Sequence, residues 1–164
     1  MTAQHTVLAT QIGDLTVVRD GELLTGLYFP HHWYRPDPVT FGPRNDEGFQ
    51  DVAAQLAEYL AGTRTEFDLP LDPRGTEFQL RVWELIARIP YGETTSYGDI
   101  ARRLGGPETA QEVGVAVGRN PLSILIPCHR VIASNGKLTG YAGGLKRKQW
   151  LLELEQAQVA VPLW

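Results

Sequence analysis

The chain has 164 residues, 43% of them hydrophobic and 21% charged, with a formal net charge of −4 at pH 7. This length is sufficient for one domain, or for two small lobes, around a proper hydrophobic core. No apolar stretch approaches the roughly 18 residues of a membrane span, and a single cysteine excludes an internal disulfide and a thiolate zinc site. Because residues 1–5 lack the basic and apolar regions of a signal peptide, we expect a cytoplasmic protein, associated with the nucleoid if it is bacterial.

The charges are unevenly distributed along the chain. Residues 1–74 carry five basic and eleven acidic side chains, whereas residues 75–164 carry ten basic and eight acidic ones. The acidic half is therefore expected to be structural, and a surface that faces phosphate groups is expected in the second half. Random scatter of surface charge explains the same difference equally well.

The first thirty residues predict a small antiparallel sheet. Short apolar runs occur at 7–9, 15–18 and 23–29, and pairs of glycine and aspartate at 13–14 and 20–21 separate them as turns. Strands that are joined by such short turns form an antiparallel meander.

A loop and a helix are expected next. Four prolines between residues 30 and 45 favour a loop. The adjacent His31 and His32 could suggest a metal site, but no carboxylate or thiol stands at ligand spacing, and we expect solvated side chains. Apolar residues at helical spacing then predict an amphipathic helix over 46–61.

The connection to a second lobe is predicted after this helix. We expect a strand through Phe67 and Leu69, followed by a linker over 70–75 that is rich in proline and glycine. The chain would therefore divide into a structural N-terminal lobe, residues 1–74, and a C-terminal lobe, residues 75–164.

Helical patterns dominate the second lobe. Thr76 and Gln79 form a capping-box pattern at the start of a helix that ends before Pro90. A last helix is expected over about 145–157. The residues that we expect on its buried face are Leu145, Trp150, Leu151 and Leu152.

Between these helices the sequence predicts a helix-turn-helix. Ser96 caps a short helix, glycines at 105–106 turn the chain, and Pro107 suits the first position of a second helix that runs to Gly118. DNA-binding proteins use this pattern, but any two helices joined by a short turn satisfy it. Alone, the pattern does not establish DNA binding.

The single cysteine, Cys128, stands in an apolar segment that also contains Pro127, His129 and Arg130. A base and a cation beside a thiol are the surroundings that lower the pKa of a cysteine and make the thiolate nucleophilic. The alternative is a buried structural cysteine, but such a residue gains nothing from ionisable neighbours. We therefore interpret Cys128 as a nucleophile at the edge of a packed core.

This combination resembles the O6-alkylguanine-DNA alkyltransferases, also called methylated-DNA–protein-cysteine methyltransferases. The resemblance covers about residues 75–155, and its most specific part is Pro127–Val131, with Arg119–Pro121 before it and Gly140–Leu145 after it. The other matching segments are Gly75–Gln79, Ile89–Thr94 and Ser96–Tyr97. The resemblance implies a mixed α/β (α+β) fold. A lobe with a small antiparallel sheet and a helix would precede a mostly helical lobe that carries the helix-turn-helix and the active-site cysteine.

The resemblance implies DNA repair by direct reversal of damage. The alkyl group of O6-alkylguanine, or of O4-alkylthymine as a less favoured substrate, would pass irreversibly to Cys128, so that each molecule reacts once. The target base would be flipped out of double-stranded DNA that is bound through its minor groove. We expect a monomer without a cofactor, because the cysteine itself is the acceptor, and without a metal, because a convincing ligand set is missing.

The resemblance also implies roles for individual residues. Glu155 would polarise His129, and His129 would reach the thiol through water. Tyr97 would bond the flipped base and share a proton with it as it leaves, while Asn120 would stiffen the turn before the cysteine. The catalytic set is Cys128, His129, Glu155, Asn120 and Tyr97. The substrate-binding set is Tyr97, Ala142, Val131, Lys148 and Gly143. The DNA-binding set is Ser96, Thr109, Ala110, Gln111, Gly114, Arg119 and Arg130, of which Arg130 could instead tie the two lobes together.

One position departs from the family pattern. The second helix of the motif usually has an early arginine that fills the gap left by the flipped base, whereas this chain has Gln111 followed by Glu112. Glutamine lacks the cation that attracts phosphates, so we expect weaker DNA affinity than is typical of the family. The change is also compatible with a protein engineered for self-labelling with benzylguanine reagents.

Two other functions remain possible on the sequence alone. A non-catalytic module of the same architecture would bind alkylated DNA for other machinery, but such relatives lack the cysteine that is present here. A cysteine hydrolase could use Cys128 and His129, although hydrolases take their base from a distant segment and also need an oxyanion hole.

Overall fold

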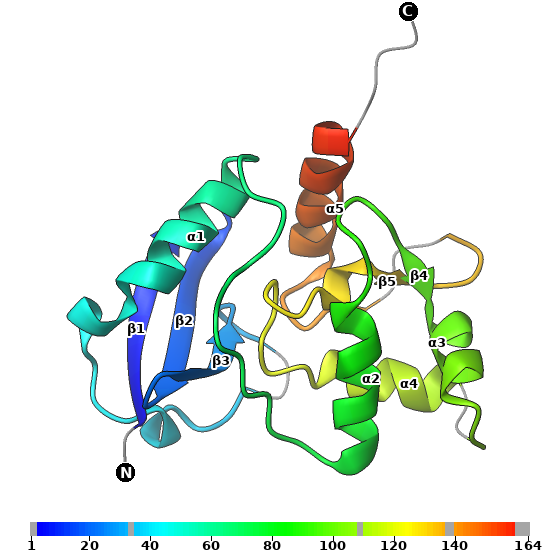
Figure 1. Cartoon of the computed structure of the whole chain (residues 1–164), viewed down its shortest axis with the longest axis horizontal. Helices are drawn as coiled ribbons and strands as arrows, with labels where there is room; N and C mark the ends of the chain where they lie inside the picture. The colour runs from blue at the N-terminus through cyan, green and yellow to red at the C-terminus, as the bar shows by residue number, and fades with distance from the viewer. Residues whose placement is uncertain (1–2, 33–34, 108–109, 137–139, 160–164) are drawn as a thin grey trace, which may run out of the picture.

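The computed structural model describes residues 3–32, 35–107, 110–136 and 140–159. Two lobes lie side by side, one built on a sheet with a single long helix and the other built mainly of helices (Figure 1). This is the mixed α/β architecture that the sequence predicts. Across the described residues, no helix is both long enough and apolar enough to span a membrane.

The N-terminal lobe contains the predicted antiparallel sheet, with β2 in the centre. Its strands are β1 (Ala3–Thr10), β2 (Gly13–Asp20) and β3 (Leu23–Tyr28). The first turn lies at residues 11–12, two residues earlier than the sequence suggested, because Gly13 already pairs with Thr10. The inner face of the sheet buries apolar side chains against the helix of this lobe. These side chains are Leu15, Val17, Leu24 and Leu27.

The helix of this lobe begins later than predicted. Residues Asp46–Phe49 form a short 3-10 turn, η2, and the α-helix α1 covers Gln50–Leu60. The apolar positions that predicted the helix are all buried, and they are Phe49, Val52, Leu56, Tyr59 and Leu60. A second 3-10 turn, η1 (Pro38–Phe41), interrupts the predicted loop.

The predicted strand through Phe67 and Leu69 is absent from the described chain, where this segment forms only an isolated bridge. Leu24 donates its N–H to Pro70, and Asp72 donates its N–H to Leu24, both at 2.8 Å. The pairing stays local because prolines cannot donate to a longer ladder.

The expectation that His31 and His32 are solvated is wrong for His32. This side chain is buried, its ring stacks on Phe29, and its Nδ1 accepts the backbone N–H of Phe29 at 3.1 Å. The imidazole is held by a hydrogen bond to the backbone three residues earlier in the chain. A search for apolar spacing does not reveal such a local bond.

The C-terminal lobe contains the predicted helices. They are α2 (Glu77–Ala87), α3 (Tyr97–Leu104), α4 (Ala110–Gly118) and α5 (Leu145–Val159). The capping box of Thr76 and Gln79 is formed, and the Ser96 hydroxyl accepts the N–H of Asp99 at 3.0 Å. Gly105 ends α3 in the left-handed region, at φ 69°, which favours glycine. Pro107 lies in a bend outside α4 and not at its first position.

A short parallel pair joins the helix-turn-helix to the cysteine segment. Strand β4 (Thr95–Ser96) pairs with β5 (Val131–Ile132), so the residue before α3 is fixed beside the segment that follows Cys128. The sequence did not predict these strands, because two residues are too short to show a period.

The inner face of α5 is more polar than predicted. Leu145 is 48% exposed, whereas Lys148, Leu151 and Glu155 are fully buried. Trp150 and Leu152 are only half-buried. Charged side chains can be buried when they have polar partners. A search for apolar spacing therefore does not identify this face of the helix.

Candidate active site

Cys128 lies in a 3-10 turn, η3 (Cys128–Arg130). Asn120 supports this turn from both sides, because its Nδ2 donates to the Ile126 carbonyl at 2.8 Å and its Oδ1 accepts the Leu122 N–H at 3.0 Å. Ile124, between them, has a φ of 70°, which is costly for a β-branched residue. The surrounding hydrogen bonds therefore hold the cysteine segment in a defined, strained path.

A buried charge network stands beside the cysteine. Glu155 Oε2 accepts from His129 Nε2 at 2.8 Å. The guanidinium of Arg130 donates to both carboxylate oxygens of Glu155 at 2.8 Å and to the Ile89 carbonyl at 2.6 Å. The structure thus brings together the two residues for which the sequence predicted a contact, His129 and Glu155.

The position of Arg130 corrects its place in the DNA-binding set. Its side chain is 9% exposed and its guanidinium donates to Glu155 and Ile89. A phosphate would have to compete with a buried carboxylate for these donors. Arg130 therefore belongs to the interior network, within the C-terminal lobe.

Sequence reasoning missed Tyr59 as a member of this network. This residue comes from α1 of the other lobe, and its hydroxyl donates to Glu155 Oε2 at 2.5 Å and lies 3.4 Å from His129 Nε2. The helical pattern identified Tyr59 only as a core residue. The available signal was chemical, because a buried tyrosine hydroxyl needs a polar partner.

The pKa of the thiol contradicts the sequence-based expectation. Burial raises the pKa of Cys128, and the smaller influences of Asn120, Lys148 and Tyr141 only oppose this rise. The expectation was wrong because the segment lies inside the core, with Cys128 only 3% exposed, and not at its edge. The raised pKa favours the protonated thiol in the free protein.

The histidine beside it is neutral. Burial lowers the pKa of His129, although the hydrogen bond and charge of Glu155 act in the opposite direction. Burial also acts to raise the pKa of Glu155, but hydrogen bonds from His129 and Arg130 outweigh it and lower that pKa to about 2. A carboxylate only accepts, so Nε2 of His129 carries the proton and Nδ1 has the lone pair.

Part of the predicted substrate-binding set gathers around Lys148. Lys148 is fully buried, and its Nζ donates to the Val131 carbonyl at 2.7 Å. The same Nζ lies 5.9 Å from the centre of the Tyr97 ring. Burial lowers the pKa of Lys148 to about 8, while the Cys128 charge acts to raise it.

The glycine-rich segment of the substrate-binding set packs against the N-terminal lobe. Ala142 and Gly143 are buried, and a Cβ on Gly143 would lie 2.3 Å from the Phe29 ring. Arg147 places its guanidinium 5.2 Å from the centre of the same ring and donates to the Gly143 carbonyl at 2.9 Å. Gly143 therefore permits a close approach that a larger residue would prevent.

Three of the predicted DNA-binding residues, Ala110, Gln111 and Gly114, lie on α4, and Arg119 directly follows it. Ala110, Gln111 and Arg119 are exposed, and Gly114 lies beside the Tyr97 ring, where a Cβ would approach it to 3.7 Å. Ser96 serves as the cap of α3. The last member of the set, Thr109, lies outside the described residues.

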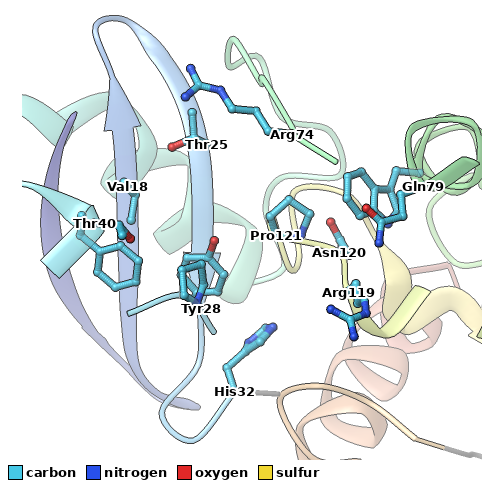
Figure 2. A pocket seen from close by; sticks show the side chains of 13 residues that line it. Val18, Thr25, Tyr28, His32, Thr40, Arg74, Gln79, Arg119, Asn120 and Pro121 are labelled. Atoms are coloured by element: carbon cyan, nitrogen blue, oxygen red, sulfur yellow. The ribbon is translucent and has the colours of Figure 1, made fainter. Parts of the chain in front are cut away.

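A separate cavity of about 340 Å³ opens between the lobes. Tyr28 and His32 face it from the N-terminal lobe, and Gln79, Arg119 and Asn120 face it from the C-terminal lobe (Figure 2). Cys128 is not among its lining residues. Elsewhere in the described part of the chain, no three His, Cys, Asp or Glu side chains gather as a metal site would require.

Comparison with known proteins identifies relatives along almost the whole chain. A methylated-DNA–protein-cysteine methyltransferase of Mycobacterium tuberculosis is 48% identical over 160 residues, which cover 97% of this chain and 96% of that protein. The protein of the same name from Methanosarcina acetivorans is 43% identical over 92% of this chain and 97% of its own length. The crystal structure of Mycobacterium tuberculosis OGT in complex with DNA superposes with a TM-score of 0.88, at 46% identity and 94% coverage of each chain.

The family descriptions divide between the two lobes. Residues 4–73 match "6-O-methylguanine DNA methyltransferase, ribonuclease-like domain", and residues 77–157 match "6-O-methylguanine DNA methyltransferase, DNA binding domain". Together with the buried cysteine and its histidine–carboxylate network, these matches show that the chain belongs to the 6-O-methylguanine DNA methyltransferase family.

Proposed function

We propose that Cys128 accepts the alkyl group when this protein repairs O6-alkylguanine in DNA. Repair of DNA by alkyl transfer to a cysteine follows from the family and from relatives named for that reaction. The chain has one cysteine, and the observation that carries the proposal is its position beside the His129–Glu155 pair. DNA is the partner, and a helix-turn-helix stands in the same lobe.

The reaction begins with removal of the thiol proton. Because Nε2 of His129 donates to ionised Glu155, the lone pair of Nδ1 is the available base. This Nδ1 is buried and has no hydrogen-bond partner in the described part of the chain. We propose that Nδ1 takes the proton of Cys128 through water. The raised thiol pKa keeps the sulfur protonated until the damaged guanine is bound.

The transfer itself exchanges a proton for an alkyl group. The sulfur of Cys128 forms a bond to the alkyl carbon, the bond from that carbon to guanine O6 breaks, and its electrons remain on the base. The phenol of Tyr97 supplies a proton to the departing guanine. The proton that His129 took from the thiol then replaces the one that Tyr97 gave up. Lys148, beside the Tyr97 ring, stabilises negative charge there during the step.

The remaining roles follow from position. We propose that α4 enters the minor groove with Ala110 and Gly114 toward the DNA backbone, and that the turn at Ala142 closes over the flipped base. The same proposal divides the chain into a structural lobe, 1–74, and a reacting lobe, 75–164. It also includes a cytoplasmic location near the DNA.

A mass measurement tests the proposed function. The protein is incubated with duplex DNA that carries one O6-methylguanine, and the intact mass is recorded over time. One added methyl group per molecule, without further turnover, is the expected result. Tight binding of this DNA without a change of mass would identify a lesion-binding module. Continued turnover of an ester or amide, offered to the protein separately, would identify a hydrolase.

Gln111→Arg is expected to tighten binding to undamaged duplex DNA at low salt. Gln111 is exposed on α4, and one added phosphate contact should steepen the dependence of log affinity on log salt by about 0.9. Gln50→Arg, which adds the same charge to exposed α1, is the matched control. If the Gln111→Arg protein and the unchanged protein bound DNA with equal affinity, the glutamine at position 111 would not explain weak binding.

Alkylation is expected to destabilise the fold. Cys128 is 3% exposed, and an extra methyl group in a filled interior costs about 1–3 kcal/mol. For a chain of this size the melting temperature should therefore fall by roughly 2–12 °C. Differential scanning calorimetry of methylated protein, freed of DNA, provides the measurement. A constant or higher melting temperature would contradict tight packing around the sulfur.

A further inference from the structure

The hydroxyl of Tyr59 joins the N-terminal lobe to the reacting histidine. Tyr59 is 1% exposed on α1, and Figure 1 shows α1 and α5 on opposite sides of the boundary between the lobes. Its ring is fixed by Phe67, at 5.2 Å between centroids, and by Tyr91, which meets it edge-on at 6.2 Å. The hydroxyl therefore has little freedom to leave Glu155.

This hydroxyl is one of several donors to the Glu155 carboxylate. Oε1 accepts from Arg130 Nε, while Oε2 accepts from Arg130 Nη2, His129 Nε2 and the Tyr59 hydroxyl. Burial, and then the charge of Glu155, raise the pKa of Tyr59 well above its ordinary value. The phenol is therefore protonated at neutral pH and donates to Glu155.

The donors share one negative charge. Each hydrogen bond to Oε2 disperses that charge and reduces the attraction that an imidazolium at His129 would feel. The other charged or titratable groups that act on the pair or on Tyr59 are Arg130 on η3, Lys148 on α5 and Tyr91 after α2. The positive charges of Arg130 and Lys148 disfavour a protonated His129, and the negative charge of Glu155 favours it. The hydrogen bond from Tyr59 weakens this effect of Glu155.

We propose that Tyr59 is a positioning residue that holds Glu155 and keeps His129 in its neutral, proton-accepting form over the working pH range. The N-terminal lobe thereby sets the pH dependence of a reaction that takes place in the other lobe. The inference rests on the proposed function, in which His129 takes the thiol proton.

The pH dependence of single-turnover methyl transfer tests this role in Tyr59→Phe. The substitution keeps the ring and removes only the donor. The acid limb of the rate profile should move to higher pH by about one unit, as expected for loss of one charge-assisted hydrogen bond. The rate near the foot of that limb should fall roughly tenfold, and the rate on the alkaline plateau should stay within about twofold.

Tyr91→Phe is the matched control. The Tyr91 hydroxyl is also buried near the network, but no hydrogen-bond partner for it is found among the described residues. Its profile should match that of the unchanged protein. An unchanged profile in Tyr59→Phe, or an equal loss of rate at every pH, would overturn the proposal, because a purely structural role predicts no change in pH dependence.

A second variant keeps the test open should Tyr59→Phe fail to fold. Incorporation of 3-fluorotyrosine at position 59 preserves the hydrogen bond and strengthens the donor, because fluorine makes the phenol more acidic. The acid limb should then move to lower pH, opposite to the shift in Tyr59→Phe, and a shift in the same direction would overturn the proposal. Failure of the unchanged protein to accept methyl at any pH would instead contradict the proposed function.

Discussion

Replacing Cys128 by serine is expected to slow methyl transfer by roughly a thousandfold or more. A serine hydroxyl remains protonated at a pH where His129 can still deprotonate a thiol, and an alkoxide in a buried site is costly. The two side chains are similar in size, so the 3-10 turn and its support by Asn120 should persist. Rapid-quench measurement of methyl loss from an O6-methylguanine duplex gives the rate.

The same variant separates chemistry from DNA binding. Affinity for the damaged duplex should stay within about threefold of the unchanged protein, because the exposed residues of α4 are untouched. Damaged guanine that loses its methyl group at the normal rate in Cys128→Ser would show that another group accepts it.

Glu155→Gln is expected to reduce the free energy of unfolding by about 3–5 kcal/mol. The substitution preserves the shape of the side chain but leaves the Arg130 charge, 9% exposed, without its carboxylate. For this chain length the melting temperature should fall by roughly 6–20 °C. Methyl transfer should also slow by roughly a hundredfold, since His129 loses the acceptor that fixes its tautomer. Glu153→Gln, an exposed neighbour on α5, is the matched control.

The pH dependence of stability provides a second measurement on Glu155. Its pKa is about 2 in the folded protein and ordinarily 4.5, so the stabilisation is complete above the ordinary value and is lost as pH falls toward 2. Urea unfolding between pH 6 and 3 should show a steeper loss of stability in the unchanged protein than in Glu155→Gln. Parallel curves would mean that the carboxylate is not held ionised by its partners.

Local signals in the sequence were sufficient for much of the fold. Turn residues and apolar alternation predicted the three-stranded sheet, and side-chain caps at Thr76 and Ser96 predicted where two helices begin. These features depend on residues close in sequence, which explains their success. The segment at Phe67 failed because its alternation reflects packing on the core without a strand partner.

Features that depend on distant partners were not predictable. The pairing of β4 with β5 requires contacts between segments far apart in the chain, and the contact of Glu155 with His129 was expected only because of the family resemblance. Tyr59 reaches the site from the other lobe, and no spacing rule connects it with His129. The expected low pKa of Cys128 failed for a related reason, because burial is a property of the whole fold. The boundary near residue 74, the monomeric state and the individual roles of the site residues stay predictions.

Transfer of an isotopically labelled methyl group tests the central claim most directly. Duplex DNA with labelled O6-methylguanine is incubated with the protein, and the digested chain is mapped by mass spectrometry. The account predicts the whole label on the sulfur of residue 128, in a one-to-one ratio with repaired guanine. Label on His129, on Lys148 or in a small product released to solution would contradict it.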